Sequence, residues 1–111
     1  MSGISTHVLD TARGMPAAGV GVTLEAAGPG GWRDLARGTT DADGRIAALL
    51  PDGAPAVGDY RLRFATGDYF RGLGQSAFYP EIVIHVRLEV HTKYHLPLLL
   101  SPFGYSTYRG S

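Results

Sequence analysis

Four histidines are the residues of this 111-residue chain best suited to acid–base chemistry, because imidazole titrates near neutral pH. His85 and His91 fall on the polar side of an alternating stretch, where a solvated or interface-facing side chain is the ordinary interpretation. His7 and His95 have apolar and β-branched neighbours, among which an imidazole needs a hydrogen-bond partner. On spacing alone, a structural histidine is the ordinary interpretation of these two as well.

A guanidinium and the end of the chain complete the set of candidate groups. Arg45 directly follows the turn-forming pair Asp43-Gly44, and by itself it is interpreted as a surface arginine at a hairpin end. The last residues, Tyr108-Arg109-Gly110-Ser111, follow a run of aromatic and β-branched residues that predicts a strand rather than a frayed tail. We therefore expect this ending to place a guanidinium, a hydroxyl and a carboxylate together.

Several kinds of chemistry find no motif in the sequence. The chain has no cysteine, which excludes disulfides, thiolate catalysis and cysteine-ligated zinc. It contains no nucleophile elbow, HExxH pair or phosphate-binding loop, and the glycine-rich segment 28–31 does not join a strand to a helix. We expect neither a cofactor nor a metal site.

Composition narrows the partners and the compartment. Ten basic and ten acidic residues balance, which argues against binding to nucleic acid or to an anionic membrane surface and permits self-association. No stretch approaches the length of a membrane span, and the first residues do not resemble a signal peptide. The length suits one domain, 1–111, and we expect it in the cytoplasm.

Sixteen glycines and seven prolines divide the chain into segments that suit strands. Alternation is clearest at 82–91, where Ile82, Ile84, Val86, Leu88 and Val90 share one face. A short helix is expected at 68–73. The spacing predicts an all-β, antiparallel sandwich, with strands expected at 4–9, 20–25, 32–40, 45–47, 59–64, 82–91, 94–100 and 104–108.

Three blocks resemble the transthyretin-related family over almost the whole chain. They are Ser5-Thr6-His7-Val8-Leu9-Asp10 with Gly14 and Pro16-Ala17, then Thr40 with Asp43-Gly44-Arg45, and then the segment from Tyr94 to Ser111. The terminal Tyr-Arg-Gly-Ser resembles the ending of the hydrolases in this family, and the hormone carriers of the family lack that ending. One departure is Lys93, where relatives often carry a second histidine.

The resemblance implies a fold, an assembly and an activity. The fold is a transthyretin-like sandwich of two four-stranded sheets with one short helix. The assembly is a homotetramer, a dimer of dimers, with active sites in the channel between dimers. The activity is hydrolysis of 5-hydroxyisourate to 2-oxo-4-hydroxy-4-carboxy-5-ureidoimidazoline in urate degradation, without metal or cofactor.

The family's active-site residues carry over to His7, Arg45, His95 and Ser111, with Tyr108 and Arg109 in the same signature. The two histidines would activate water and transfer protons, while Arg45 would bind substrate and stabilise charge. Ser111 would orient an imidazole or the water through its hydroxyl or carboxylate, and Tyr108 and Arg109 would contact substrate. The alternatives are a non-catalytic carrier of small ligands and a structural β-sandwich domain.

Overall fold

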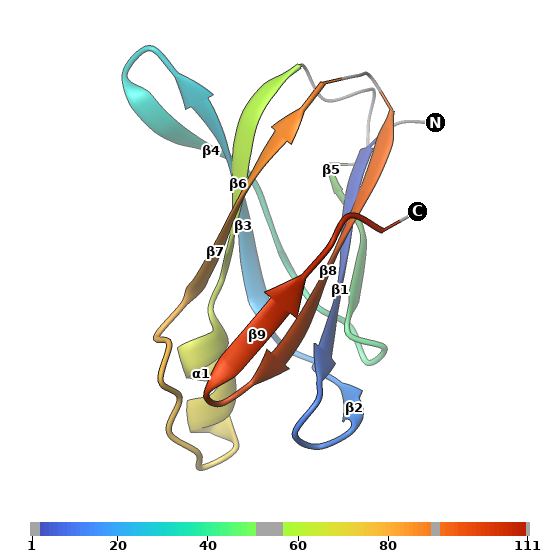
Figure 1. Cartoon of the computed structure of the whole chain (residues 1–111), viewed down its shortest axis with the longest axis vertical. Coiled ribbons are helices and arrows are strands. Elements are labelled where there is room, and N and C mark those ends of the chain that lie inside the picture. The colour runs from blue at the N-terminus through green and yellow to red at the C-terminus, as the bar shows by residue number, and fades with distance from the viewer. Residues whose placement is uncertain (1–2, 51–56, 90–91, 111) are drawn as a thin grey trace.

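A computed structural model describes residues 3–50, 57–89 and 92–110. Within these ranges, nine strands form two facing sheets, with one helix at an end of the sandwich (Figure 1). The elements are β1 (Gly3–Asp10), β2 (Met15–Pro16), β3 (Gly21–Gly28), β4 (Gly31–Thr39), β5 (Arg45–Leu50), β6 (Gly58–Phe64), α1 (Thr66–Gly72), β7 (Ile82–Leu88), β8 (Lys93–Ser101) and β9 (Gly104–Thr107).

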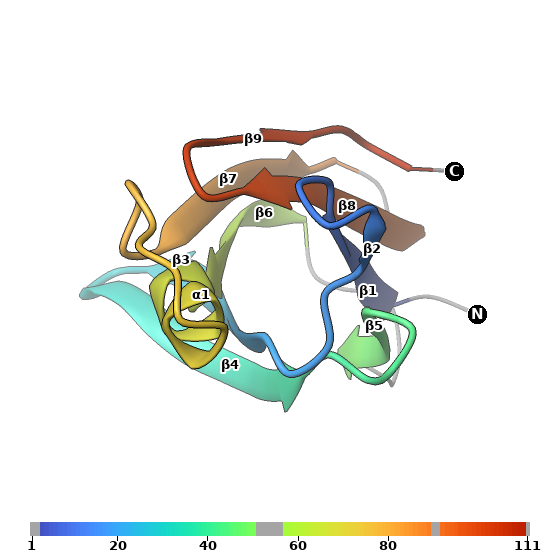
Figure 2. The ribbon, with the colours of Figure 1, turned by 90° about the horizontal axis from the view of Figure 1, so that it is seen from below.

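The first sheet runs β2-β1-β8-β9, and β5 also pairs with β1. The second sheet runs β4-β3-β6-β7. The expected sandwich is confirmed. The sequence pattern did not predict β2, because a strand of two residues is too short to show alternation. Figure 2 shows the two sheets face to face, with β7 and β9 on the same side of the sandwich.

One pairing corrects the expectation of a wholly antiparallel sandwich. β1 and β8 are parallel over eight residue pairs, from Gly3↔Lys93 to Asp10↔Leu100. Parallel neighbours need a long crossover connection, and here the whole second sheet lies between the two strands along the chain. Local alternation carries no information about strand direction, so this pairing depends on the tertiary fold.

Alternation decides which side chains enter the core. Ile4, Thr6 and Val8 of β1 and Leu96 and Leu98 of β8 are buried on the core face, so the alternation of the two strands puts Ser5, His7 and His95 on the opposite face. The second sheet contributes its own buried residues, and Phe70 of α1 closes one end of the core. The predicted alternation from residue 82 is confirmed through Leu88, whereas 90–91 lie outside the described residues.

The helix begins two residues before the predicted start and ends at Gly72. It is attached to the first sheet through the hydroxyl of Tyr69, which donates a 2.8 Å hydrogen bond to Oδ2 of Asp10. Asp10 is fully buried at the end of β1, and it also accepts a bond from the backbone N–H of Arg13. Burial is the main cause that raises the pKa of Tyr69, followed by its bond to Asp10. Asp10 of the first resemblance block therefore supports the fold.

Candidate active site

Three of the predicted catalytic residues lie on the outward face of the first sheet. His95 is the register partner of Ser5 in the β1–β8 pair, and His7 is the partner of Arg45 in the antiparallel β1–β5 pair. Ser5 and His7 are two residues apart on β1, so both point away from the core. Residues distant in sequence, 7, 45 and 95, are thereby brought to one surface by strand pairing.

Arg45 owes its position to the turn that precedes β5. Oδ1 of Asp41 accepts bonds from the backbone N–H groups of Asp43 and Arg45, an arrangement typical of aspartate in turns. Gly44 adopts φ +74°, and a Cβ there would meet the carbonyl oxygen of Val8 at 2.4 Å. Only glycine accepts both this conformation and this close approach. The turn therefore brings Arg45 directly onto β1.

Each imidazole has one ring nitrogen held by a hydrogen bond. Nε2 of His7 lies 3.1 Å from the carbonyl oxygen of Asp43. Because a carbonyl only accepts, Nε2 carries the proton and Nδ1 is the nitrogen that can receive one. In His95 the arrangement is reversed, since Nδ1 lies 2.8 Å from Oγ of Ser5. Nε2 of His95 is thereby left for chemistry.

A recess of about 270 Å³ opens beside these groups, lined by Ser5, Thr6, Arg45, Ala47, Lys93 and His95. Its charged lining residues, among those the structure describes, are the basic Arg45 and Lys93. Burial is the main cause that lowers the pKa of His95, and the charges of His7, Arg45 and Lys93 lower it further. A lowered pKa keeps this imidazole neutral, the form that accepts a proton.

The C-terminal segment is held against His95. The backbone N–H of Gly110 donates a 2.8 Å bond to the carbonyl oxygen of His95, and the two residues form an antiparallel bridge. A Cβ at Gly110 would lie 2.8 Å from Cδ2 of the His95 ring, so glycine permits this close approach. The predicted strand ends at Thr107, with this bridge beyond it. Ser111 lies outside the described residues.

Arg109 and Tyr108 are placed differently from the three residues on the outward face. The guanidinium carbon of Arg109 lies 4.9 Å from the ring centroid of Tyr94, a cation–π distance. Tyr94 is buried on the core-facing side of β8, and Arg109 lines another recess with residues of β7. The geometry thus gives Arg109 an anchoring contact, and no described contact brings it beside His95. Tyr108 is 59% exposed.

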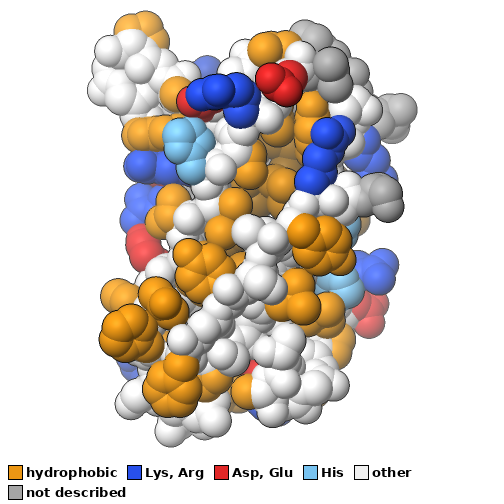
Figure 3. All heavy atoms as spheres, viewed as in Figure 1, with side chains coloured by type: hydrophobic (Ala, Val, Ile, Leu, Met, Phe, Trp, Pro, Cys, Tyr) orange, Lys and Arg blue, Asp and Glu red, His pale blue; other side chains and the backbone are white. Residues whose placement is uncertain are grey.

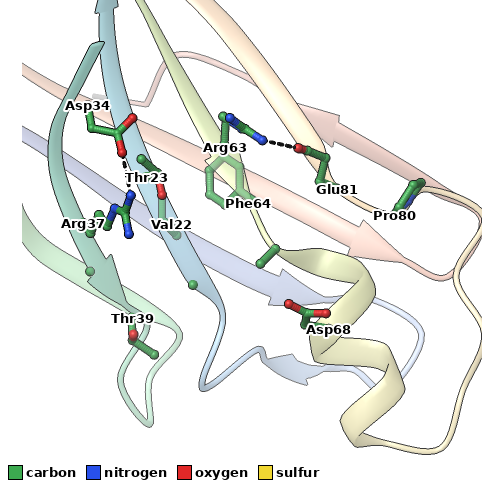
Figure 4. A pocket seen from close by; sticks show the side chains of 13 residues that line it. Val22, Thr23, Asp34, Arg37, Thr39, Arg63, Phe64, Asp68, Pro80 and Glu81 are labelled. Atoms are coloured by element: carbon green, nitrogen blue, oxygen red, sulfur yellow. Dashed lines mark hydrogen bonds and ion pairs between the residues drawn. The ribbon is translucent and has the colours of Figure 1, made fainter. Parts of the chain in front are cut away.

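A larger recess, of about 760 Å³, lies on the outer face of the second sheet (Figure 4). Its walls carry two ion pairs, Arg37 with Asp34 and Arg63 with Glu81. Each guanidinium is already engaged by a carboxylate, and none of the described catalytic candidates lines this recess. The chemistry indicated by residue type therefore belongs to the smaller recess on the first sheet.

His85, interpreted from the sequence as a polar-face residue, is indeed on the outside of the second sheet. Its Nε2 lies 3.3 Å from Oδ2 of Asp59, and its ring meets the edge of Trp32. His85 is in β7 of the second sheet, whereas His95 is in β8 of the first sheet. His91 lies outside the described residues.

The family model for the HIUase/Transthyretin family matches residues 4–110. The chain belongs to this family. It is 50% identical over 109 residues to a 5-hydroxyisourate hydrolase of Salmonella dublin, covering 97% of this chain and 80% of that protein. The match spans His7, Arg45 and His95.

Solved structures with this fold include both a hydrolase and a transthyretin in complex with thyroxine, so fold alone does not determine function. A 5-hydroxyisourate hydrolase of Klebsiella pneumoniae matches with TM-score 0.87 and 40% identity, covering 100% of this chain and 94% of that one. Sea bream transthyretin in complex with thyroxine matches with TM-score 0.89 and 33% identity, covering 96% and 93%. Function must therefore be argued from the residues of the site.

Sequence reasoning missed two residues of this site. The sequence presents Ser5 only as part of a motif and Lys93 only as a departure from relatives. The signal for Ser5 was available in part, because it lies two residues before His7 and shares its face in a strand. Lys93 likewise lies two residues before His95 and shares its face of the strand.

No helix in the described ranges is long and apolar enough to cross a membrane.

Proposed function

We propose that this chain is a hydrolase that converts 5-hydroxyisourate to 2-oxo-4-hydroxy-4-carboxy-5-ureidoimidazoline in urate degradation. The observation that carries the proposal is the convergence of His7, Arg45 and His95 on one face of the first sheet. The family supplies the substrate class, and its hydrolases match over nearly the full chain.

The reaction adds one water across a cyclic amide. A water oxygen bonds to the ring carbonyl carbon, a histidine takes the proton, and the ring C–N bond breaks as the departing nitrogen is protonated. His7 and His95 each present a ring nitrogen able to take part in these proton transfers. Arg45 binds the polar heterocycle and stabilises the charge that develops on the carbonyl oxygen.

The end of the chain completes the proposed site. The backbone N–H of Gly110 donates to the carbonyl oxygen of His95, so the described part of the C-terminal segment is attached at this histidine. Ser111 orients the water or one imidazole through its hydroxyl or its carboxylate. Tyr108, exposed beside this segment, contacts substrate, while the Arg109 guanidinium acts by anchoring the segment on Tyr94.

The experiment is a direct assay of the purified protein with freshly generated 5-hydroxyisourate, followed by loss of its ultraviolet absorbance. Acceleration over spontaneous decay supports the proposal. A rate equal to spontaneous decay, from a folded protein, would sink it. In that case a carrier of small ligands and a structural β-sandwich domain would remain, and the similarity to a transthyretin in complex with thyroxine favours the carrier. The basic and imidazole lining argues against an apolar carrier channel.

We also propose that the protein assembles as a homotetramer, a dimer of dimers. β7 and β9 are each the last strand of a sheet, and an edge strand can pair with a second copy. Hydrophobic side chains gather on the face that carries β9 (Figure 3). Phe103, directly before β9, and Tyr105 in β9 are 76% and 43% exposed, and Phe78, whose backbone N–H donates to the carbonyl of Pro102, is 71% exposed. Light scattering after gel filtration would test the assembly, and a monomer would contradict it.

The cytoplasm is the proposed location of the protein, which cell fractionation would test.

A further inference from the structure

The hydroxyl of Ser5 is the feature of the site for which the proposed reaction has no role as yet. Ser5 is 6% exposed, and its Oγ lies 2.8 Å from Nδ1 of His95. The two residues are direct register partners in the parallel β1–β8 pair, so their backbones hold this contact in place. A buried hydroxyl needs a partner, and here that partner is a predicted catalytic imidazole.

We propose that Ser5 is a positioning residue that accepts a hydrogen bond from Nδ1–H of His95 and thereby makes Nε2 the nitrogen that takes the proton from water. A neutral imidazole carries its proton on one nitrogen only, and the partner of one nitrogen determines the role of the other. This inference rests on the proposed hydrolase function, because it assigns His95 a direction of proton transfer within that reaction.

The surroundings of His95 favour this assignment over a purely structural bond. Ser5 and His95 both line the recess that also contains Arg45 and Lys93, so the bonded pair lies in the wall of the recess where substrate is proposed to bind. The opposite face of the sheet is occupied by the core, where Thr6 donates to the backbone carbonyl of Leu96 instead. Of these neighbouring hydroxyls on β1, Ser5 is the one bonded to a titrating side chain.

The hydroxyl also suits both charge states of the ring. When His95 becomes imidazolium, Nδ1–H still donates to Oγ of Ser5, and the bond is strengthened by the charge. Loss of Oγ therefore disfavours the charged form and lowers the pKa of His95 beyond the reduction caused by burial and by the positive charges nearby. It also frees the neutral ring to place its proton on Nε2, which cannot then accept one.

The test compares Ser5→Ala with two matched variants. Thr11→Val is the control, because Oγ1 of Thr11, the residue that follows β1, donates a 3.0 Å hydrogen bond to the carbonyl of Leu100 in β8. Ser5→Thr is the second matched variant, because threonine keeps a hydroxyl on the same carbon. The readouts are kcat, the pH dependence of kcat/KM, and ¹⁵N NMR of the His95 ring, which reports tautomer and pKa without any substrate.

For Ser5→Ala we expect kcat to fall roughly tenfold, the size of one lost hydrogen bond in the transition state. The acidic limb of the pH profile should move to lower pH, and the ring signals should show a mixture of tautomers. Ser5→Thr should recover most of the rate, whereas Thr11→Val should leave profile and tautomer as in the wild type.

A wild-type ring that carries its proton on Nε2, or a Ser5→Ala profile that does not move, overturns the assignment. So does a loss of rate in Ser5→Ala without any change in tautomer, because that result belongs to a packing effect. A wild-type protein that fails to hydrolyse the substrate would instead refute the proposed function. The NMR measurement would still report on the Ser5–His95 bond, so the two failures are distinguishable.

Discussion

His7 and Arg45 are register partners in the antiparallel β1–β5 pair, so an imidazole and a guanidinium occupy neighbouring positions on one face of the sheet. Directly opposed residues of such a pair have Cβ atoms about 5 Å apart. The turn at Asp41–Gly44 sets this register and also supplies the carbonyl that holds His7. A single turn thus positions two of the catalytic groups.

Replacement of the Arg45 guanidinium should reduce activity without unfolding the protein. Arg45→Ala removes the group proposed to stabilise charge on the carbonyl oxygen, which we expect to lower kcat/KM by about 10²–10³. Arg37→Ala is the matched control, since Arg37 is an exposed arginine paired with Asp34 on the other sheet. Its kcat/KM should stay within about twofold of wild type. Equal losses in both variants would remove Arg45 from the mechanism.

The single lysine of the chain should tune the pH profile. Burial is the main cause of the lowered pKa of His95, and the charge of Lys93 is one of the further causes. Lys93→Met removes that charge, so the pKa of His95 rises and the acidic limb of kcat/KM moves to higher pH. Lys93→Arg keeps the charge and should keep the profile. A shift of the Lys93→Met profile to lower pH would contradict this account.

A side chain at Gly110 should disturb the imidazole more than the fold. The Cβ of Gly110→Ala would meet Cδ2 of His95 at 2.8 Å, so either the ring or the Gly110–His95 bridge has to move. We expect kcat to fall at least tenfold, with little change in melting temperature. Gly72→Ala is the control, because a Cβ at Gly72 would meet nothing within 4 Å. Wild-type kcat in Gly110→Ala would show that the ring tolerates the contact.

Deletion of Ser111 and extension of the chain beyond it should both lower the activity. Deletion of Ser111, or a short extension beyond it, changes the group that follows the Gly110–His95 bridge. We expect loss of most activity, with the circular dichroism spectrum unchanged. A protein with a C-terminal tag that retained full activity would count against the proposed role of Ser111.

The contact between the helix and the first sheet should matter for stability but not for chemistry. Tyr69→Phe leaves Oδ2 of the buried Asp10 without the hydroxyl that donates to it. An unsatisfied buried acceptor costs about 1–3 kcal/mol of unfolding free energy. Urea denaturation should show this loss, while kcat/KM of the folded protein stays at the wild-type value. An unchanged denaturation midpoint would mean that water replaces the hydroxyl.

Much of the fold was predictable because its signals are local. Gly44 and its turn neighbours indicated where β5 begins, and the alternation from Ile82 to Leu88 indicated a strand with one buried face. The parallel direction of β1 against β8 was not predictable, since it depends on how distant segments meet. The helix differed from the prediction by two residues at its start, where no side chain caps it.

The sequence by itself determined the composition of the candidate site, through His7, Arg45, His95 and an ending similar to one branch of a known family. Only the tertiary structure decided how these residues act together. It paired His7 with Arg45, gave His95 a serine partner, added Lys93 beside the recess and turned Arg109 toward Tyr94. The physical reason is that strand pairing places residues by register across the sheet, and register depends on contacts between segments far apart in the chain.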